Sequence, residues 1–189
     1  MSKSFVRSLV ALVTFVFCFG FSTAKAQTSW TVNNFSTTYF GGQDSAITST
    51  NGHDFGGWVG SVSTQIIHPF ILYAGSSQPV VFDGILGMTL GMSPGWVSGT
   101  YMNSSSQQGA WRYSTDSHQF QDIGGSTVSA DGINSAGIVA GTANFGFFRQ
   151  GFITMPDGSI RNIGTFGGRG SRLYALNDRF AVGTSELPT

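Results

Sequence analysis

A pattern that returns about every 41 residues constrains this chain more than any other feature of its sequence. Three short segments with an aromatic third residue lie 41 residues apart: His68-Pro69-Phe70, Gly109-Ala110-Trp111 and Gln150-Gly151-Phe152. A fixed period of about 20 to 50 residues is typical of repeat proteins, in which each unit is one supersecondary element. The chain is therefore expected to fold as an array of similar units.

Two further series share this period. Four short apolar runs each close on a glycine, and these glycines are 39, 42 and 42 residues apart: Gly60, Gly99, Gly141 and Gly183. A Phe-Gly-Gly-x-x-Ser segment occurs at residues 40–45 and returns at 166–171, three periods later. Because the series keep one register, we expect strand–turn–strand halves at about 45–62, 88–100, 130–142 and 172–184.

Turn-forming residues separate the apolar runs. Pro94-Gly95 precedes one run, residues 134–137 (Asn-Ser-Ala-Gly) precede the next, and Asp157-Gly158 follows the third aromatic segment. Glycine adopts positive φ freely, and Asn and Asp tolerate it, so such sequences join short strands. One unit is then four strands in about 41 residues, the size of a β-propeller blade.

Composition excludes the helical alternatives. Beyond residue 26 the chain has no Lys and one Glu, so two strong surface helix formers are nearly absent. We predict an all-β fold of about four repeats of roughly 41 residues, propeller-like, with a small closed ring favoured and an open β-solenoid as the alternative. The ring is favoured because a strand near Trp30 would complete the last unit and cover its exposed edge.

The first 26 residues have a different character. Lys3 and Arg7 precede an apolar stretch from Leu9 to Phe21, and Ala24-Lys25-Ala26 follows it. This order is typical of a secretory signal peptide, and the apolar stretch is shorter than the roughly 20 residues that a membrane-spanning helix needs. We expect a signal peptide at 1–26, a β-repeat domain at 27–189, a secreted protein (extracellular or periplasmic), and no membrane span after signal removal.

The remaining composition limits the partners. The one cysteine, Cys18, lies in the leader, so residues 27–189 offer neither disulfides nor thiolate metal sites. Those residues carry six arginines against nine acidic residues. A basic surface for nucleic acid is therefore not expected.

The best-formed unit has a recognisable order of motifs. Residues 132–141 read Gly-Ile-Asn-Ser-Ala-Gly-Ile-Val-Ala-Gly, Phe152 follows, residues 162–168 read Asn-Ile-Gly-Thr-Phe-Gly-Gly, and a further half unit runs from Tyr174 to Gly183. This order resembles the HAF-repeat family of bacterial extracellular proteins, named for a His-Ala-Phe tripeptide in a unit of about 40 residues. No unit here has the whole tripeptide. The resemblance implies secretion and a β-repeat architecture, and it implies no particular activity.

No set of residues in the sequence forms a coherent catalytic or metal-binding group. Residues 91–95 match Gly-x-Ser-x-Gly, but Pro94 lacks the backbone N–H that a serine nucleophile's oxyanion hole requires. The three histidines are too scattered along the sequence for a compact metal site. The loop at 131–137 offers too few oxygens for calcium. The glycine-rich stretch near Arg169 lacks the lysine of a P-loop. We expect no catalytic residue, no metal and no cofactor.

Aromatic residues are the remaining candidates for binding. Phe70, Trp111 and Phe152 share one repeat phase and are expected in the core, whereas Trp58 and Trp96 neighbour glycine-rich turns and are predicted as surface binding residues.

The leading hypothesis is a non-enzymatic binding or interaction module with an envelope glycan or protein as partner, its ligand and oligomeric state open. One alternative is a glycan-acting hydrolase that draws carboxylates from different units: Asp83, Asp122 or Asp131. The other is a truncated repeat array without independent function.

Overall fold

A computed structural model describes residues 39–188 except 42, 104 and 125–128. These residues belong to one compact unit, Asn34–Thr189. The predicted signal peptide and the predicted strand near Trp30 lie outside the described residues. Within the described ranges, no helix is long and apolar enough to cross a membrane.

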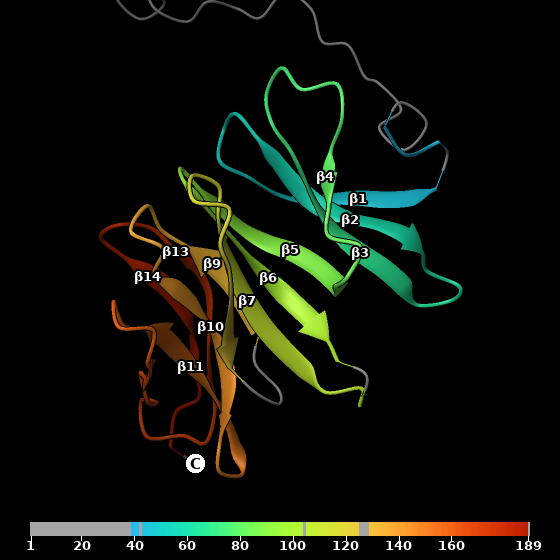
Figure 1. Ribbon diagram of the computed structural model, residues 1–189. Helices are drawn as coiled ribbons and strands as arrows, with labels where there is room; N and C mark the ends of the chain where they lie inside the picture. Colours follow the sequence, from blue (N-terminus) through green and yellow to red (C-terminus); the bar gives the residue numbers. More distant parts are fainter. Residues whose placement is uncertain (1–38, 42, 104, 125–128, 189) are drawn as a thin grey trace, which may run out of the picture. The chain divides into compact units, whose positions relative to one another are not determined.

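The fold is all-β, as predicted, and consists of four antiparallel sheets that the chain forms one after another (Figure 1). Sheet A contains β1 (Asp44–Thr50), β2 (Phe55–Ser61), β3 (Ile66–Leu72) and β4 (Val80–Val81). Sheet B contains β5 (Leu86–Ser93), β6 (Trp96–Met102), β7 (Gln108–Ser114) and β8 (Phe120–Gly124). Sheet C contains β9 (Ser129–Ile133), β10 (Val139–Phe145), β11 (Phe148–Thr154) and β12 (Ile160–Asn162). Sheet D contains β13 (Ser171–Leu176) and β14 (Ala181–Ser185).

The strand–turn–strand halves lie where the sequence predicts them, and so do the turns. Ser93 ends β5 and Trp96 begins β6, so Pro94 and Gly95 form the hairpin turn that was predicted in place of a nucleophile elbow. Gly95 has φ of 78°, which a residue with a side chain rarely adopts. Within each sheet, consecutive strands are hydrogen-bonded neighbours.

Every sheet has the same irregularity where its first two strands pair. The first strand contains a bulge, and the residue before the bulge lies opposite a glycine of the second strand. These pairs are Ile47 with Gly57, Thr89 with Gly99, Ala130 with Gly141, and Leu173 with Gly183. A bulge bends its strand and increases the local twist. At each of these glycines an added Cβ would overlap a carbonyl oxygen of the first strand.

The pairing corrects one member of the predicted glycine series. Gly57, not Gly60, occupies in sheet A the position that Gly99 and Gly141 occupy in sheets B and C. The corrected series is spaced by 42 residues throughout. The sequence predicted the wrong glycine because β2 contains Gly56, Gly57 and Gly60. Only the strand register shows which of them lies opposite the bulge.

The phased aromatic residues form the core, as predicted. Phe70, Trp111 and Phe152 lie on β3, β7 and β11, the third strand of their sheets, and each is fully buried. Each is also the direct neighbour of the glycine that lies opposite the bulge, on the second strand: Gly57, Gly99 and Gly141. Because these glycines have no side chain, the rings lie against their Cα atoms. The bulge, the glycine and the aromatic residue therefore form one structural element that spans three strands.

Successive sheets pack through the first strand of the following sheet. β5 contacts β1, β2 and β3; β9 contacts β5, β6 and β7; β13 contacts β9, β10 and β11. Buried apolar clusters fill the junctions, for example Ile71 of sheet A with Val97 and Trp111 of sheet B. In the described part of the chain β14 pairs only with β13, and no closed ring is present there.

A buried arginine links sheets B and C. The Arg112 side chain is only 9% exposed; its Nη1 donates to the carbonyl oxygen of Gly137 at 2.6 Å, and its Nε donates to Gln121 Oε1 at 2.8 Å. Its guanidinium lies 5.4 Å from the centre of the Trp96 ring. Burial lowers the pKa of Arg112. No carboxylate pairs with it among the residues described.

Replacing Arg112 by methionine is expected to lower the free energy of unfolding by about 2 kcal/mol. Methionine keeps much of the apolar contact with Trp96 but leaves the Gly137 carbonyl oxygen without its donor. Urea unfolding followed by tryptophan fluorescence measures the change. Arg161→Met is the matched control, because Arg161 is exposed on β12, and its stability should change by less than about 0.5 kcal/mol. Equal stability of the two variants would show that Arg112 does not join the sheets.

Candidate functional site

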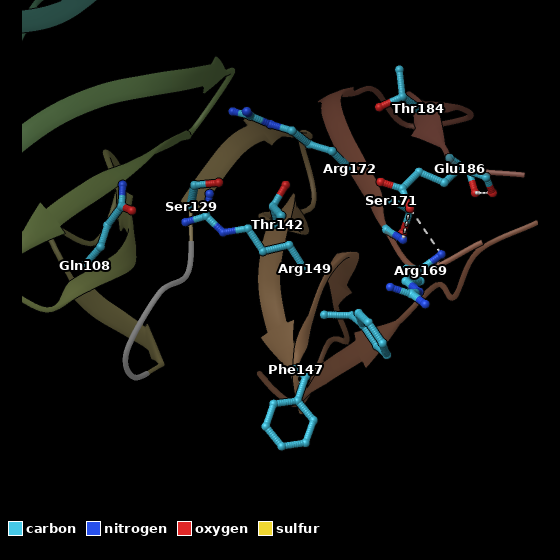
Figure 2. Close-up of a pocket in the computed structure, with 13 residues that line it drawn as sticks. Gln108, Ser129, Thr142, Phe147, Arg149, Arg169, Ser171, Arg172, Thr184 and Glu186 are labelled. Carbon is cyan, nitrogen blue, oxygen red and sulfur yellow. Dashed lines mark hydrogen bonds between the residues drawn. The ribbon is translucent and has the colours of Figure 1, made fainter. Parts of the chain in front are cut away.

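A pocket of about 610 Å³ lies over sheets C and D, and Gln108 of sheet B lies at one side of it (Figure 2). Strands β9, β10, β11, β13 and β14 all contribute to its walls. The lining consists of three arginines, two phenylalanines, one acidic residue and small polar residues. This volume is within the range of about 300 to 1,000 Å³ that is usual for ligand pockets.

The three arginines reach the pocket from different segments. Arg149 follows the β10–β11 turn, Arg169 lies in the loop before β13, and Arg172 lies on β13. Arg172 is held by Asp131, whose Oδ1 is 3.5 Å from Nη2, and by the Tyr174 ring, 5.0 Å from the guanidinium. The guanidinium groups of Arg149 and Arg169 have no hydrogen bond or ion pair with the described residues. Figure 2 shows Arg149 and Arg172 extending in the same direction.

Glu186, the one acidic residue among the described lining residues, is already hydrogen-bonded to backbone. Oε2 of Glu186 accepts the backbone N–H of Arg169 at 3.2 Å and that of Gly170 at 3.0 Å (Figure 2). The backbone N–H of Glu186 in turn donates to the carbonyl oxygen of Gly170 at 2.9 Å. Glu186 therefore fixes the glycine-rich loop to the end of the chain's last strand, and the arginines outnumber the acids in the pocket.

Thr142, on β10, is a buried lining residue with an unpaired hydroxyl. The residue is 7% exposed, and its Oγ1 has no hydrogen-bond partner within the described structure. The neighbouring Ser171 is different: its hydroxyl donates to the carbonyl oxygen of Gly164 at 2.6 Å and accepts the N–H of Gly151 at 2.9 Å. A buried hydroxyl without a partner costs about 1 to 3 kcal/mol.

Replacing Thr142 by valine is expected to raise the free energy of unfolding by about 1 kcal/mol, because the unpaired hydroxyl is removed at nearly constant shape. Thr154→Val provides the contrast: Thr154 Oγ1 accepts the N–H of Val139 at 2.9 Å, and its loss should cost about 1 to 3 kcal/mol. Thermal unfolding of both variants tests whether Thr142→Val gains stability and Thr154→Val loses it. A loss of stability in Thr142→Val would show that the hydroxyl has a partner in the folded protein.

Two phenylalanines stand exposed at the edge of the pocket. Phe147, in the β10–β11 turn, is 102% exposed, and Phe148 at the start of β11 is 42% exposed. Figure 2 shows the Phe147 ring projecting away from the strands. Turns are usually polar, so these exposed rings beside a polar pocket are candidates for contact with a ligand.

Two other pockets hold further polar groups. One of about 650 Å³ lies on sheet A and includes Asp44, Asp83 and His68, whose Nδ1 donates to the carbonyl oxygen of Ile85 at 3.0 Å. The other, of about 460 Å³, includes Tyr101, whose hydroxyl donates to Asp122 Oδ2 at 2.9 Å. Burial, and then the bond to Asp122, raise the pKa of Tyr101.

The predicted binding tryptophans lie elsewhere. Trp58 and Trp96 are both half-buried, and neither lines any of the three pockets described above. Trp96 packs against the core between sheets B and C, with Arg112 over its ring. Trp58 lies between Ala46 and Pro69 in the pairing of sheet A. For Trp96 these contacts indicate a packing role.

No two of the three aspartates of the hydrolase hypothesis line the same described pocket. Asp83 lies in the pocket of sheet A, Asp122 in the pocket with Tyr101, and Asp131 pairs with Arg172. In the portion of the chain that the structure describes, no three His, Cys, Asp or Glu side chains are grouped as metal ligands.

The glycine-rich stretch near Arg169 was considered in the sequence only as a P-loop, and the arginine pocket itself was not predicted. The signal that could have found it is the segment Phe145-Gly146-Phe147-Phe148, because an apolar turn between two strands is unusual. Comparisons of the chain with family models, curated proteins and solved structures found no match. The candidate site therefore rests on its own geometry.

Proposed function

We propose that this protein is a secreted, non-enzymatic binding or interaction module that acts at the cell envelope or outside the cell. Its binding site is the pocket of Arg149, Arg169 and Arg172. The observation that carries the proposal is that the guanidinium groups of Arg149 and Arg169 have no partner among the described residues and lie in a pocket edged by the exposed Phe147. Glu186, the only carboxylate among the described lining residues, is bonded to backbone. Such a pocket offers binding groups without an acid–base pair.

The proposal includes an architecture of about four repeats of roughly 41 residues, similar to HAF repeats, closed into a small propeller-like ring. The shared bulge and glycine of the four sheets support the repeat. Closure would give β14 a second neighbour and remove an open edge. Hydrogen exchange tests closure: in a ring, the β14 amides that point away from β13 are protected as well as those bonded to β13. Rapid exchange of the amides that point away from β13 indicates an open stack.

Binding to a panel of envelope glycans and envelope proteins tests the function. We expect at least one partner to bind the purified protein. Arg149→Gln should reduce that binding without unfolding the protein, because Arg149 lines the pocket and its guanidinium has no hydrogen bond or ion pair with the described residues. Chemical breakdown of a bound glycan by the protein would contradict the non-enzymatic proposal. Non-cooperative unfolding would instead favour an array fragment without function of its own.

One observation favours a glycan-acting hydrolase as the second candidate. Asp44 and Asp83 line the same pocket on sheet A, and glycoside hydrolysis usually requires two carboxylic acids that flank the scissile bond. Release of reducing ends by the wild-type protein, lost in Asp83→Asn, would establish this candidate. No release from any glycan in the panel would eliminate it.

A further inference from the structure

The arginine pocket concentrates positive charge on a chain that is otherwise acidic. Residues 27–189 carry six arginines and nine acidic residues, and three of the six arginines line this one pocket. Arg172 is partly neutralised by Asp131, and Arg149 and Arg169 have no ionic partner among the described residues. The pocket therefore favours an anionic ligand, while the rest of the surface does not attract polyanions in general.

The positively charged side chains of the pocket limit which anions can bind. They are all arginines, because residues 27–189 contain no lysine. A guanidinium is planar and donates two parallel hydrogen bonds to a carboxylate or to a phosphate, which adds geometric selection to charge attraction. Arg149, Arg169 and Arg172 approach from three segments, so they suit carboxylates at more than one place on a ligand.

The glycine-rich loop of the pocket does not present the backbone N–H groups of Gly164, Arg169 and Gly170 to a phosphate. A glycine-rich loop binds phosphate through successive N–H groups that point at the ligand. Here the N–H groups of Arg169 and Gly170 donate to Glu186 Oε2, and the N–H of Gly164 donates to Asn162 Oδ1 at 2.7 Å. These donors of the loop are occupied, and the arginine side chains remain as the groups that can meet a ligand.

The remaining lining residues suit a sugar. Phe147 offers an open ring face, on which the C–H face of a sugar ring can stack, and a small inorganic anion has no such face. Ser129 and Thr184 add hydroxyl groups, which can bond to the hydroxyls of a sugar. The pocket thus combines charge, an apolar platform and neutral hydrogen-bonding groups.

We infer that the pocket binds an acidic oligosaccharide built from uronic acid residues, with its carboxylates on Arg149, Arg169 and Arg172 and one sugar ring on Phe147. This inference rests on the proposed binding function and specifies its ligand class.

Isothermal titration of the purified protein with tetragalacturonate tests the inference. We expect saturable binding that weakens as salt is raised, and at least about ten-fold weaker binding of the methyl-esterified tetrasaccharide, which keeps the sugar rings and loses the charge. Arg149→Gln and Arg169→Gln should each weaken binding about ten-fold, and Phe147→Ala several-fold. Arg161→Gln is the matched control outside the pocket and should bind as the wild type does.

Three results would overturn the inference. The methyl ester could bind as tightly as the acid, Arg161→Gln could weaken binding as much as Arg149→Gln, or a single-stranded DNA oligonucleotide of equal charge could bind as tightly. Tighter binding of a sulfated tetrasaccharide than of tetragalacturonate would also overturn the choice of carboxylate. If tetragalacturonate fails while another glycan binds and Arg149→Gln abolishes that binding, the ligand class is wrong and the proposed function stands.

Discussion

Replacing Gly141 by alanine is expected to lower the free energy of unfolding by about 3 kcal/mol or more. An added Cβ would overlap the carbonyl oxygen of Ser129 on β9 and lie 3.0 Å from Cε1 of Phe152. The first obstacle is backbone within a paired strand, and the second is a fully buried ring, so neither can move without disturbing sheet C. Chemical denaturation measures the loss.

The control for this prediction is Gly84→Ala. An added Cβ at Gly84 meets no atom within 4 Å. Its stability should therefore stay within about 0.5 kcal/mol of the wild type, or rise slightly because alanine restricts the unfolded chain. If Gly141→Ala were as stable as Gly84→Ala, the bulge–glycine–aromatic element would not determine the packing of the sheets.

Replacing Trp111 by alanine is expected to lower the free energy of unfolding by about 3 to 5 kcal/mol. The side chain is fully buried, and its Nε1 donates to the carbonyl oxygen of Thr100 at 3.1 Å. Its ring lies 5.6 Å from the rings of Phe82 and Phe120. Alanine therefore opens a cavity at the junction of sheets A and B and leaves a carbonyl oxygen without its donor.

Two further variants separate the causes. Trp111→Phe keeps an aromatic ring but loses the hydrogen bond, so its loss of stability should be smaller than that of Trp111→Ala. Phe147→Ala removes a ring that is fully exposed and should leave the stability within about 0.5 kcal/mol of the wild type. Equal losses in Trp111→Ala and Phe147→Ala would contradict the assignment of the core.

The sequence predicted the strands, turns and core of this protein because each depends on local chemistry that repeats. Pro94 and Gly95 suit a hairpin turn wherever they occur, and three aromatic residues at one phase indicate a shared buried position. It could not identify Gly57, because the choice among neighbouring glycines depends on the strand register. The register shift at the bulge of β1 becomes visible only when β1 and β2 are paired.

The candidate site was harder to predict from the sequence than the strands and the core were. Arg149, Arg169 and Glu186 lie on different segments, and they share a pocket only because β13 packs on sheet C and β14 returns beside it. Nothing in their spacing resembles a motif. The sequence predicted Trp58 and Trp96 as binding residues because both neighbour glycine-rich turns. In the fold, the Arg112 guanidinium lies over the Trp96 ring.

The central claim is that the arginine pocket on sheets C and D is the binding site of this protein. An NMR titration of the ¹⁵N-labelled protein with tetragalacturonate tests it most directly, because backbone and arginine side-chain signals locate the ligand on the structure. The account predicts that the largest shifts occur at Arg149, Arg169 and Phe147. Shifts concentrated at Asp44 and Asp83 on sheet A would contradict it, whereas an unchanged spectrum would overturn only the choice of an acidic oligosaccharide as the ligand.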